Sequence, residues 1–554
     1  MIRPPSAPTA LAALVVVTAV LARRPIGFPA LRRLTAILEG PILPWVVGLG
    51  AAVAVWCTWG SLDPMPVYHD EAAYLLQAQL LARGVIAAPP APIPEFFQQF
   101  YVFVTPVLAS KYPPGFALSM VPGIWLGLPA LMPILLTGAA AGLGFVLSRR
   151  ASNGAVALLG TVLWLIAPGN LLMHAGYFSE ALTSALWLAG WWALLRWREA
   201  YRTRFLVLLA ACVGALAMTR PFTAVLYALP IGVVVLLDLK RRSAWRQLWP
   251  AAAGGIIAFG LLPIQNRLVT GHWSEMAYSL YTNTYLPYDR MGFGLHTAVP
   301  KADLPPDLVA LTGYFEAIHQ AHTVARLPET AVDRITALLW ELSNHAPFVF
   351  GLLALLGLRP SFPLLRFASA ATLVLFAGHL FYAHQAAWYI YYEEVFPVIT
   401  LLVAVGLAEV VHWTARLAVS PLTRESEARR EMVAIALAAV AMLVVLPSRV
   451  QRIRFFVSVT AEKQARFRDL VRRLPARSIV FVRYAPQHDE HYSLITNPPD
   501  YTRAPAWIVY DRGEDDQRLM ALAPDRIPYL YLEAEHRLTP MTPGPGGESS
   551  GQSR

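Results

Sequence analysis

The chain has few charged residues. Of its 554 residues 14% are Asp, Glu, Lys or Arg, while 56% are hydrophobic and the mean hydropathy is +0.47. Soluble globular domains carry about a quarter of their residues as charges, so this balance excludes a soluble multidomain protein and a disordered chain. Cysteine is also scarce: Cys57 and Cys212 both lie inside apolar runs, and two such residues exclude a disulfide scaffold.

Apolar runs of near-membrane length are abundant instead. Such runs fit helices that satisfy their own backbone hydrogen bonds in lipid, and the 16 Trp and 22 Tyr residues are typical of membrane interfaces. The net charge of +10 indicates basic cytoplasmic loops before it indicates nucleic acid, and we expect no nucleic-acid partner. The sequence therefore predicts a polytopic α-helical membrane protein.

The positive-inside rule orders the apolar runs into eleven spans from a cytoplasmic start. These spans are expected at 41–60, 129–147, 154–173, 181–197, 205–218, 221–238, 247–265, 346–358, 367–383, 395–412 and 432–447. Residues 1–40 hold an apolar segment, interpreted as an extra helix in or on the membrane, and a basic cytoplasmic loop, so the total becomes 11–12 helices. Residues 41–449 then form the transmembrane domain, with long outer loops at 61–128 and 266–333.

The C-terminal part has a different character. Residues 450–540 predict a small α/β domain, with strands at 478–483, 506–510 and 527–532 and a helix near 515–523. Residues 541–554 are rich in Gly, Pro and Ser and predict disorder. Eleven spans place this domain outside the cytoplasm. Eight basic residues after the last span oppose that orientation: Arg449, Arg452, Arg454, Lys463, Arg466, Arg468, Arg472 and Arg473.

Two acidic residues, Asp70 and Glu71, open a helical pattern in the first outer loop. In a purely structural interpretation Asp70 caps the helix and Glu71 complements its dipole. Helical geometry also places Asp70, Tyr74 and Gln77 on one polar face, at positions i, i+4 and i+7. Carboxylates at a membrane edge are costly unless they have a function, which favours a site.

A second motif, Ser110-Lys111-Tyr112-Pro113-Pro114-Gly115, lies in the same loop. The two prolines fix an extended or turning backbone before an apolar segment. Lys111 either extends to the lipid headgroups or presents a cation to a phosphate near the membrane surface.

These motifs together resemble the GT-C superfamily of membrane glycosyltransferases, in the branch of bacterial relatives of protein O-mannosyltransferases and lipid A aminoarabinose transferases. The Asp-Glu pair, A-x-Y-L, a Gly about 13 residues later and Lys-x-Pro-Pro carry the resemblance. Residues 266–294, 389–397 and the tail segment around 497–500 extend it along the chain. The poorly characterised subgroup usually has Arg-Tyr-Tyr where this chain has Ile390-Tyr391-Tyr392.

The resemblance implies inverting transfer of a sugar from a polyprenyl phosphate to a lipid, glycan or protein acceptor, on the outer face of the bacterial cytoplasmic (inner) membrane. It implies a carboxylate base, for which Asp70 is the first candidate and Glu71 the second. It also implies cations at the departing phosphate, for which the candidates are Lys111 and then Arg220. Membrane lipids would surround the enzyme. Because such a donor leaves a single phosphate, no cofactor is required, and the sequence shows no dedicated cluster of metal ligands. A divalent metal is left open.

Nine further residues are candidates for a substrate cleft: Tyr74, His174, Tyr177, Glu180, Tyr285, Asp289, Arg290, His384 and Glu393. For each alone, an interfacial anchor, a helix cap or simple packing is the commoner role. Two other functions compete with the enzyme: a transporter or flippase of a lipid-linked or anionic solute, and a non-catalytic envelope assembly protein. Transporters tend to show internal repeats and charges at the bilayer midplane. This chain shows no repeat and its charges cluster at the outer rim, which favours the enzyme.

Overall fold

The structure is a computed structural model. It describes residues 28–294, 300–301, 303–342, 347–359, 362–418, 424–489 and 491–541. The N-terminal apolar segment before residue 28 and the C-terminal stretch after residue 541 lie outside the described residues, so the expectations for them remain predictions.

Each of the eleven expected spans coincides with a helix or a broken helix. These are α3 (Leu43–Trp59), α6 (Leu131–Ala151), α7 (Gly154–Ile166) with α8 (Pro168–His174), α9 (Glu180–Ala200), α10 (Thr203–Ala217), α11 (Pro221–Arg242), α12 (Leu248–Phe259) with α13 (Leu261–Thr270), α17 (Pro347–Gly357), α18 (Pro363–His379), α19 (Phe396–Ala418) and α20 (Arg424–Val440). Within the described residues, five helices are long and apolar enough to cross a membrane unaided, or seven if each of two bent pairs is one span. The polytopic helical architecture is confirmed.

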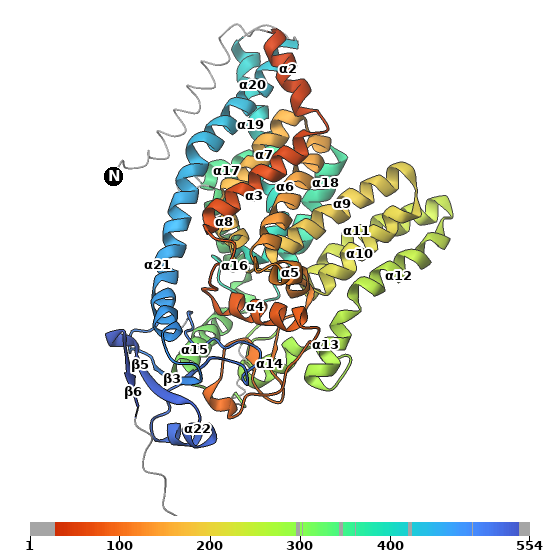
Figure 1. Ribbon diagram of the computed structural model, residues 1–554. Helices are drawn as coiled ribbons and strands as arrows, with labels where there is room; N and C mark the ends of the chain where they lie inside the picture. The colour runs from red at the N-terminus through yellow and green to blue at the C-terminus, as the bar shows by residue number, and fades with distance from the viewer. Residues whose placement is uncertain are drawn as a thin grey trace, which may run out of the picture.

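Two of these spans differ from simple rods. The chain bends by 71° between α7 and α8, where Pro168 begins the second helix and cannot donate a backbone hydrogen bond to the first. The last span does not stop at the membrane edge: α20 passes through a π-helical turn, Ala441–Val445, into α21 (Leu446–Arg472). The helix α21 therefore continues the last span and runs from the bundle to the sheet (Figure 1).

The C-terminal sheet has the order β4-β3-β5-β6. The strands β3 (Ser478–Arg483), β4 (Ala506–Tyr510) and β5 (Ile527–Leu532) coincide with the three expected strands and are parallel, and α22 (Asp516–Leu522) connects the last two. The strand β6 (Arg537–Pro540) pairs antiparallel with β5 and was not expected. Its four residues end in Pro540, which is typical of an edge strand and gives little alternation to detect.

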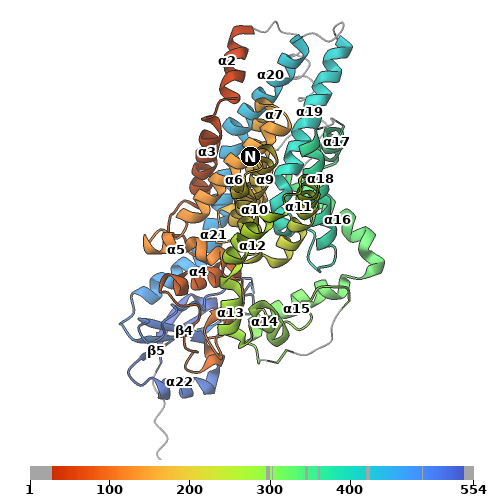
Figure 2. The ribbon, with the colours of Figure 1, turned by 90° about the vertical axis from the view of Figure 1, so that its right-hand side faces the viewer.

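A layer of loops and short helices lies between the bundle and the sheet (Figures 1 and 2). It contains α4 (His69–Ala82), β1 (Val102–Phe103), β2 (Ala109–Ser110), α5 (Gly115–Trp125), α14 (Ala277–Tyr285) and α15 (Pro306–Ala321), while α16 (Leu327–Leu342) leads back to the bundle and α2 (Phe28–Leu38) precedes α3. The expected outer loop 266–333 is thus largely helical. One apolar core joins Phe96 and Tyr281 of this layer to Phe481 and Val509 of the sheet, so the sheet holds the loops in place.

Candidate active site

The two acidic residues of α4 have different surroundings. The Oε2 atom of Glu71 accepts hydrogen bonds from the backbone N–H groups of Val67 (2.8 Å) and Tyr68 (3.1 Å), and Oε1 accepts one from Tyr177 N–H (2.9 Å). Glu71, and not Asp70, therefore caps α4. Burial raises the pKa of Glu71, and these three hydrogen bonds oppose the rise. Both of its oxygens hold backbone in place.

Asp70 instead faces Tyr112, the second residue of Lys-x-Pro-Pro. The Tyr112 hydroxyl donates a hydrogen bond to Asp70 Oδ1. The Tyr74 ring stacks on the Tyr112 ring with centres 4.4 Å apart, and Gln77 Nε2 donates to the Tyr112 carbonyl (2.8 Å). The expected polar face of Asp70, Tyr74 and Gln77 is confirmed, and all three side chains contact Tyr112. Asp70 is half-buried; burial raises its pKa, against the Tyr112 hydrogen bond and the charge of Lys111.

Lys111 lies beside this pair in a box of tyrosine rings. Its side chain is 3% exposed, with Nζ 3.6 Å from the ring centre of Tyr101 and 4.4 Å from that of Tyr278. Ring faces attract a cation, but Lys111 forms no ion pair with any residue that the structure describes. Burial lowers the pKa of Lys111 to about 8, although Asp289 and Asp70 attract its charge. The ammonium group thus has unused capacity to bind an anion.

Asp289 provides the second carboxylate of this cluster. Its Oδ1 accepts a hydrogen bond from the Tyr382 hydroxyl (2.8 Å) and lies 3.3 Å from His319 Nε2, while Oδ2 accepts one from the Tyr278 hydroxyl (3.3 Å). Burial raises the pKa of Asp289, but the hydrogen bonds from His319 and Tyr382 and the charge of Lys111 outweigh it and hold the pKa below its usual value. Asp289 is therefore ionised and partly balances Lys111.

A close backbone contact connects the lysine motif to the turn before α11. Gly115 N–H donates to the Met218 carbonyl (2.9 Å), and a Cβ atom on Gly115 would lie 2.1 Å from Thr219 Oγ1. Only glycine allows this approach. The contact brings the turn that carries Arg220 against the segment that carries Lys111.

Arg220 is already paired. Its Nη1 donates to Glu180 Oε1 (3.2 Å), to Glu394 Oε1 (3.2 Å) and to the Ile390 carbonyl (2.9 Å). Both carboxylates are buried. Ile390 occupies the position of the first residue of the Arg-Tyr-Tyr motif that is usual in the subgroup this chain resembles. Its backbone carbonyl accepts a hydrogen bond from Arg220. The charge of Arg220 is compensated within the protein.

The other cleft candidates fall into two groups. His174, Tyr177 and Glu393 are buried in the bundle: His174 bonds to Thr137 Oγ1 (2.8 Å) and Glu393 Oε1 (3.3 Å), and the Tyr177 hydroxyl donates to the Pro64 carbonyl (2.9 Å). These contacts tie the three side chains to neighbouring segments of the chain.

The remaining three candidates belong to the loop layer or its edge. His384 Nε2 lies 3.0 Å from the Tyr392 hydroxyl. Tyr285 is buried and packs on Tyr281 with ring centres 4.4 Å apart. Arg290 is exposed and donates to Asn283 Oδ1 (3.1 Å), so it lies outside the cluster of Asp70, Lys111 and Asp289.

Several residues of this cluster had not been singled out from the sequence. They are Tyr101, Tyr112, Tyr278, His319, Tyr382 and His491. His491 comes from the loop after β3, and its charge lowers the pKa of Asp70; the neighbouring Tyr492 pairs with Tyr68 through a β-bridge. Tyr112 was detectable because it lies inside the lysine motif. Within the described residues, no group of three or more His, Cys, Asp or Glu side chains is placed to hold a metal ion.

No protein-family model matches this chain, and no curated protein sequence does. ArnT from Cupriavidus metallidurans in the apo state superposes with a TM-score of 0.52 and 15% identity, over 89% of this chain and 93% of that chain. The crystal structure of ArnT bound to undecaprenyl phosphate gives 0.51 and 16%, over 89% and 94%. The chain has the GT-C fold. The likeness covers nearly the whole of both chains, so the resemblance found in the sequence is confirmed as a resemblance of fold.

Proposed function

We propose that this protein is a membrane glycosyltransferase that transfers a sugar from a polyprenyl-phosphate donor to a lipid, glycan or protein acceptor, with inversion at the anomeric carbon. One observation carries the proposal: Tyr112 joins a half-buried carboxylate, Asp70, to a buried lysine, Lys111, that has no ion pair among the described residues. A carboxylate and an anion-binding cation are the two groups that this reaction needs. ArnT, which shares the fold, was crystallised with undecaprenyl phosphate.

Asp70 acts as the general base in this proposal. As the acceptor oxygen forms its bond to the anomeric carbon, its proton passes to the Asp70 carboxylate, and the bond from that carbon to the phosphate oxygen breaks. A carboxylate in hydrogen-bond reach of the acceptor contributes about 10²–10⁴-fold to such a reaction. Burial raises the pKa of Asp70, which strengthens it as a base.

Lys111 binds the departing phosphate. The phosphate gains negative charge as the sugar leaves, and a cation in a water-poor site stabilises that charge strongly. The tyrosine box keeps the ammonium group in place before the donor arrives. Because only one phosphate leaves, the charge to be balanced is small, and Lys111 balances it without a metal in this proposal. Treatment with EDTA tests for a metal requirement.

The proposed location is the bacterial cytoplasmic membrane, with the loop layer and the sheet on the periplasmic side. The basic residues in the last turns of α6, α9 and α11 support this orientation: Arg149, Arg150, Arg198, Lys240, Arg241 and Arg242. We expect a reporter that works only in the periplasm to be active when it is fused after Arg468, and a reporter that works only in the cytoplasm to be inactive there. A cytoplasmic signal from that fusion would overturn the orientation.

The function is tested with Asp70→Asn and its neighbour Glu71→Gln as a matched control. Purified variants are incubated with a panel of polyprenyl-phosphate sugars, and released polyprenyl phosphate is measured by mass spectrometry. Asp70→Asn should lose about 10²–10⁴-fold in kcat with an unchanged Tm. Glu71→Gln should keep its kcat and lower the Tm, because the amide has one acceptor oxygen for three backbone donors. Wild-type kcat in Asp70→Asn would remove the assignment of the base.

A further inference from the structure

Arg334 of α16 is fully buried, which is rare for an arginine that has no acidic partner. It forms no ion pair with any residue that the structure describes. Its guanidinium group donates instead to the backbone carbonyls of His379 (2.7 Å), Tyr382 (2.9 Å) and His384 (3.3 Å). Its Nε has no hydrogen-bond partner in the described part of the chain. Burying a charge without a counter-charge is costly, so this arginine needs an explanation other than ion pairing.

The three carbonyls belong to the α18–α19 segment (residues 379–392). Apart from its first residue, which ends α18, this segment contains one 3₁₀ helix of three residues, so few backbone hydrogen bonds of its own hold its shape. Arg334 also donates to the Tyr392 hydroxyl (3.4 Å), and Arg220 donates to the Ile390 carbonyl (2.9 Å). Two buried or partly buried guanidinium groups therefore hold the segment.

The α18–α19 segment reaches the proposed active site through Tyr382. The Tyr382 hydroxyl donates to Asp289 Oδ1 (2.8 Å), and the backbone of Tyr382 forms an antiparallel bridge with Met291, two residues after Asp289. Asp289 attracts the charge of Lys111. A continuous series of contacts thus leads from Arg334 through Tyr382 to the carboxylate that accompanies Lys111.

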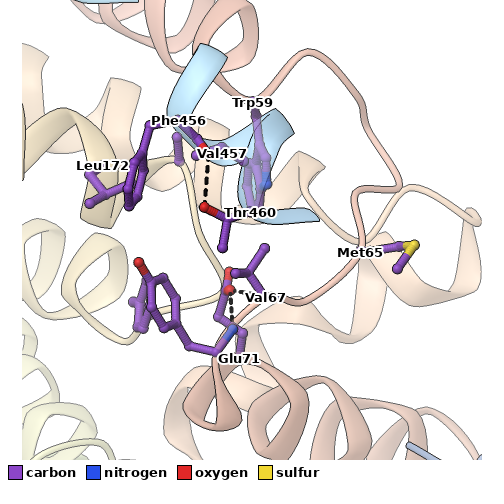
Figure 3. A pocket seen from close by; sticks show the side chains of 11 residues that line it. Trp59, Met65, Val67, Glu71, Leu172, Phe456, Val457 and Thr460 are labelled. Carbon is purple, nitrogen blue, oxygen red and sulfur yellow. Dashed lines mark hydrogen bonds between the residues drawn. The ribbon is translucent and has the colours of Figure 1, made fainter. Parts of the chain in front are cut away.

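Another part of the site is anchored in a comparable way. Glu71 lies in the wall of a small apolar pocket and accepts hydrogen bonds from backbone N–H groups before α4 (Figure 3). There a carboxylate binds backbone donors, whereas Arg334 binds backbone acceptors. The helix α4 also has the internal hydrogen bonds of its 14 residues, which the α18–α19 segment lacks. We therefore expect the site to depend more on Arg334 than on Glu71.

We propose that Arg334 is a positioning residue of the active site: it fixes the α18–α19 segment so that Tyr382 keeps Asp289 in place. Asp289 in turn stays beside Lys111. A guanidinium group suits this task because it has five N–H donors in one rigid plane and can bind several carbonyls at once. An acidic partner would occupy the N–H groups that bind these carbonyls. The consequence for catalysis rests on the proposed sugar transfer, whereas the consequence for the segment does not.

Hydrogen–deuterium exchange of the full-length protein in detergent tests the positioning without any substrate. Arg334→Lys keeps the charge but has three donors on one nitrogen. We expect exchange about fivefold faster, as for the loss of one hydrogen bond, in the α18–α19 segment and in residues 289–294. The second effect is expected because Gly292 N–H donates to the Phe381 carbonyl (2.7 Å). Unchanged exchange in residues 289–294 would overturn the proposal.

Arg526 provides a matched control in the C-terminal sheet. It is also buried and donates to backbone carbonyls, those of Ser478 (3.3 Å), Ala504 (3.1 Å) and Tyr501 (3.2 Å). Arg526→Lys should speed exchange in the sheet and leave the α18–α19 segment unchanged. Faster exchange of that segment in both variants would mean a general loosening of the protein and would overturn a specific role for Arg334.

Donor kinetics test whether the positioning serves the reaction. Arg334→Met should lower donor kcat/KM about 10–10²-fold, as for a misplaced group in an active site, and Arg334→Lys should retain more activity than Arg334→Met. Arg526→Lys should keep the wild-type value. In a Tyr382→Phe background Arg334→Met should have little further effect, because both changes interrupt the same series of contacts.

The outcomes separate this proposal from the proposed function. Multiplicative losses in the double variant would overturn the route through Tyr382. If Arg334→Met does not fold, as Tm and circular dichroism show, Arg334→Lys takes its place in the cycle. Faster exchange in residues 289–294 of Arg334→Lys, together with a wild-type protein that transfers no sugar from any donor, would support the positioning and overturn the proposed function instead.

Discussion

Lys111 and Arg220 were both expected to bind the donor phosphate, and the structure surrounds them differently. Arg220 donates to two buried carboxylates, Glu180 and Glu394, at 3.2 Å each. Lys111 has tyrosine rings as its nearest partners, and Asp289 and Asp70 attract it only from beyond ion-pair distance. The two cations lie near each other in the fold because Gly115 packs against Thr219.

The difference suggests different roles for the two cations. A buried guanidinium with two carboxylates has its charge satisfied, so a phosphate would have to displace them. A buried ammonium among neutral rings has lost its hydration, and the rings do not fully compensate that cost. An incoming phosphate would supply the missing opposite charge. We therefore assign the phosphate to Lys111 and a structural role to Arg220.

The largest expected effect on activity along this comparison comes from Lys111→Met, which keeps a long side chain without the charge. We expect kcat/KM for the donor to fall about 10²–10³-fold, as when one charge-stabilising donor is removed from an active site. The Tm should not fall, because no ion pair is lost. Donor titrations that follow polyprenyl phosphate release measure the effect. A normal donor kcat/KM would contradict the phosphate assignment.

Arg220→Gln should act on stability. The change leaves Glu180 and Glu394 buried without a cation, which typically costs about 3–5 kcal/mol. Thermal unfolding in detergent should show a clearly lower Tm, and adding Glu394→Gln should restore part of it by removing one of the stranded charges. If Arg220→Gln keeps the wild-type Tm and raises only the donor KM, then Arg220 binds phosphate after all, as first expected from the sequence.

Much of the fold could be predicted from the sequence because lipid imposes a local constraint. A span must satisfy its backbone hydrogen bonds within an apolar helix, whole or broken, so each of the eleven ranges was visible in its own residues. The helices α14 and α15 were missed because, at nine and sixteen residues, they lack the apolar length that marks a span. Both pack into the aromatic core shared with the sheet.

The candidate site was predictable only where its residues belong to one local pattern. Asp70 and Tyr112 meet because their motifs are neighbours in one loop, and the helical face of Asp70 was legible in the spacing. Tyr278, His319 and Tyr382 reach Lys111 and Asp289 from segments far along the chain, and no local pattern marks such residues. The sequence ranked Asp70 before Glu71 as the base, but the backbone N–H groups that surround the Glu71 carboxylate are visible only in the structure.

The pH dependence of the reaction sharpens the comparison further. Lys111 must be protonated to bind phosphate, and burial lowers its pKa to about 8. The donor kcat/KM should therefore be highest below this pH and fall as the pH rises through about 8. Lys111→Arg keeps its charge to much higher pH, so this decline should disappear in that variant even if its overall rate is lower. A decline near pH 8 that persists in Lys111→Arg would assign it to another group.

The smallest expected effect concerns the tyrosine box itself. Tyr278→Leu removes one ring face from Lys111 Nζ, and a partly desolvated cation–π contact contributes roughly 0.5–2 kcal/mol. The charged form of Lys111 loses that stabilisation, so the pKa falls and the decline in donor kcat/KM moves to lower pH by roughly 0.4–1.5 units at 1.36 kcal/mol per unit. Tyr278→Phe keeps the ring and should shift the decline less.

The parallel change Tyr391→Leu removes the ring 5.7 Å from Arg220 Cζ. Because carboxylates already balance Arg220, we expect Tyr391→Leu to leave the pH of the decline in donor kcat/KM unchanged. Equal shifts in Tyr278→Leu and Tyr391→Leu would mean that the rings act on both cations alike, and the distinction between Lys111 and Arg220 would fail.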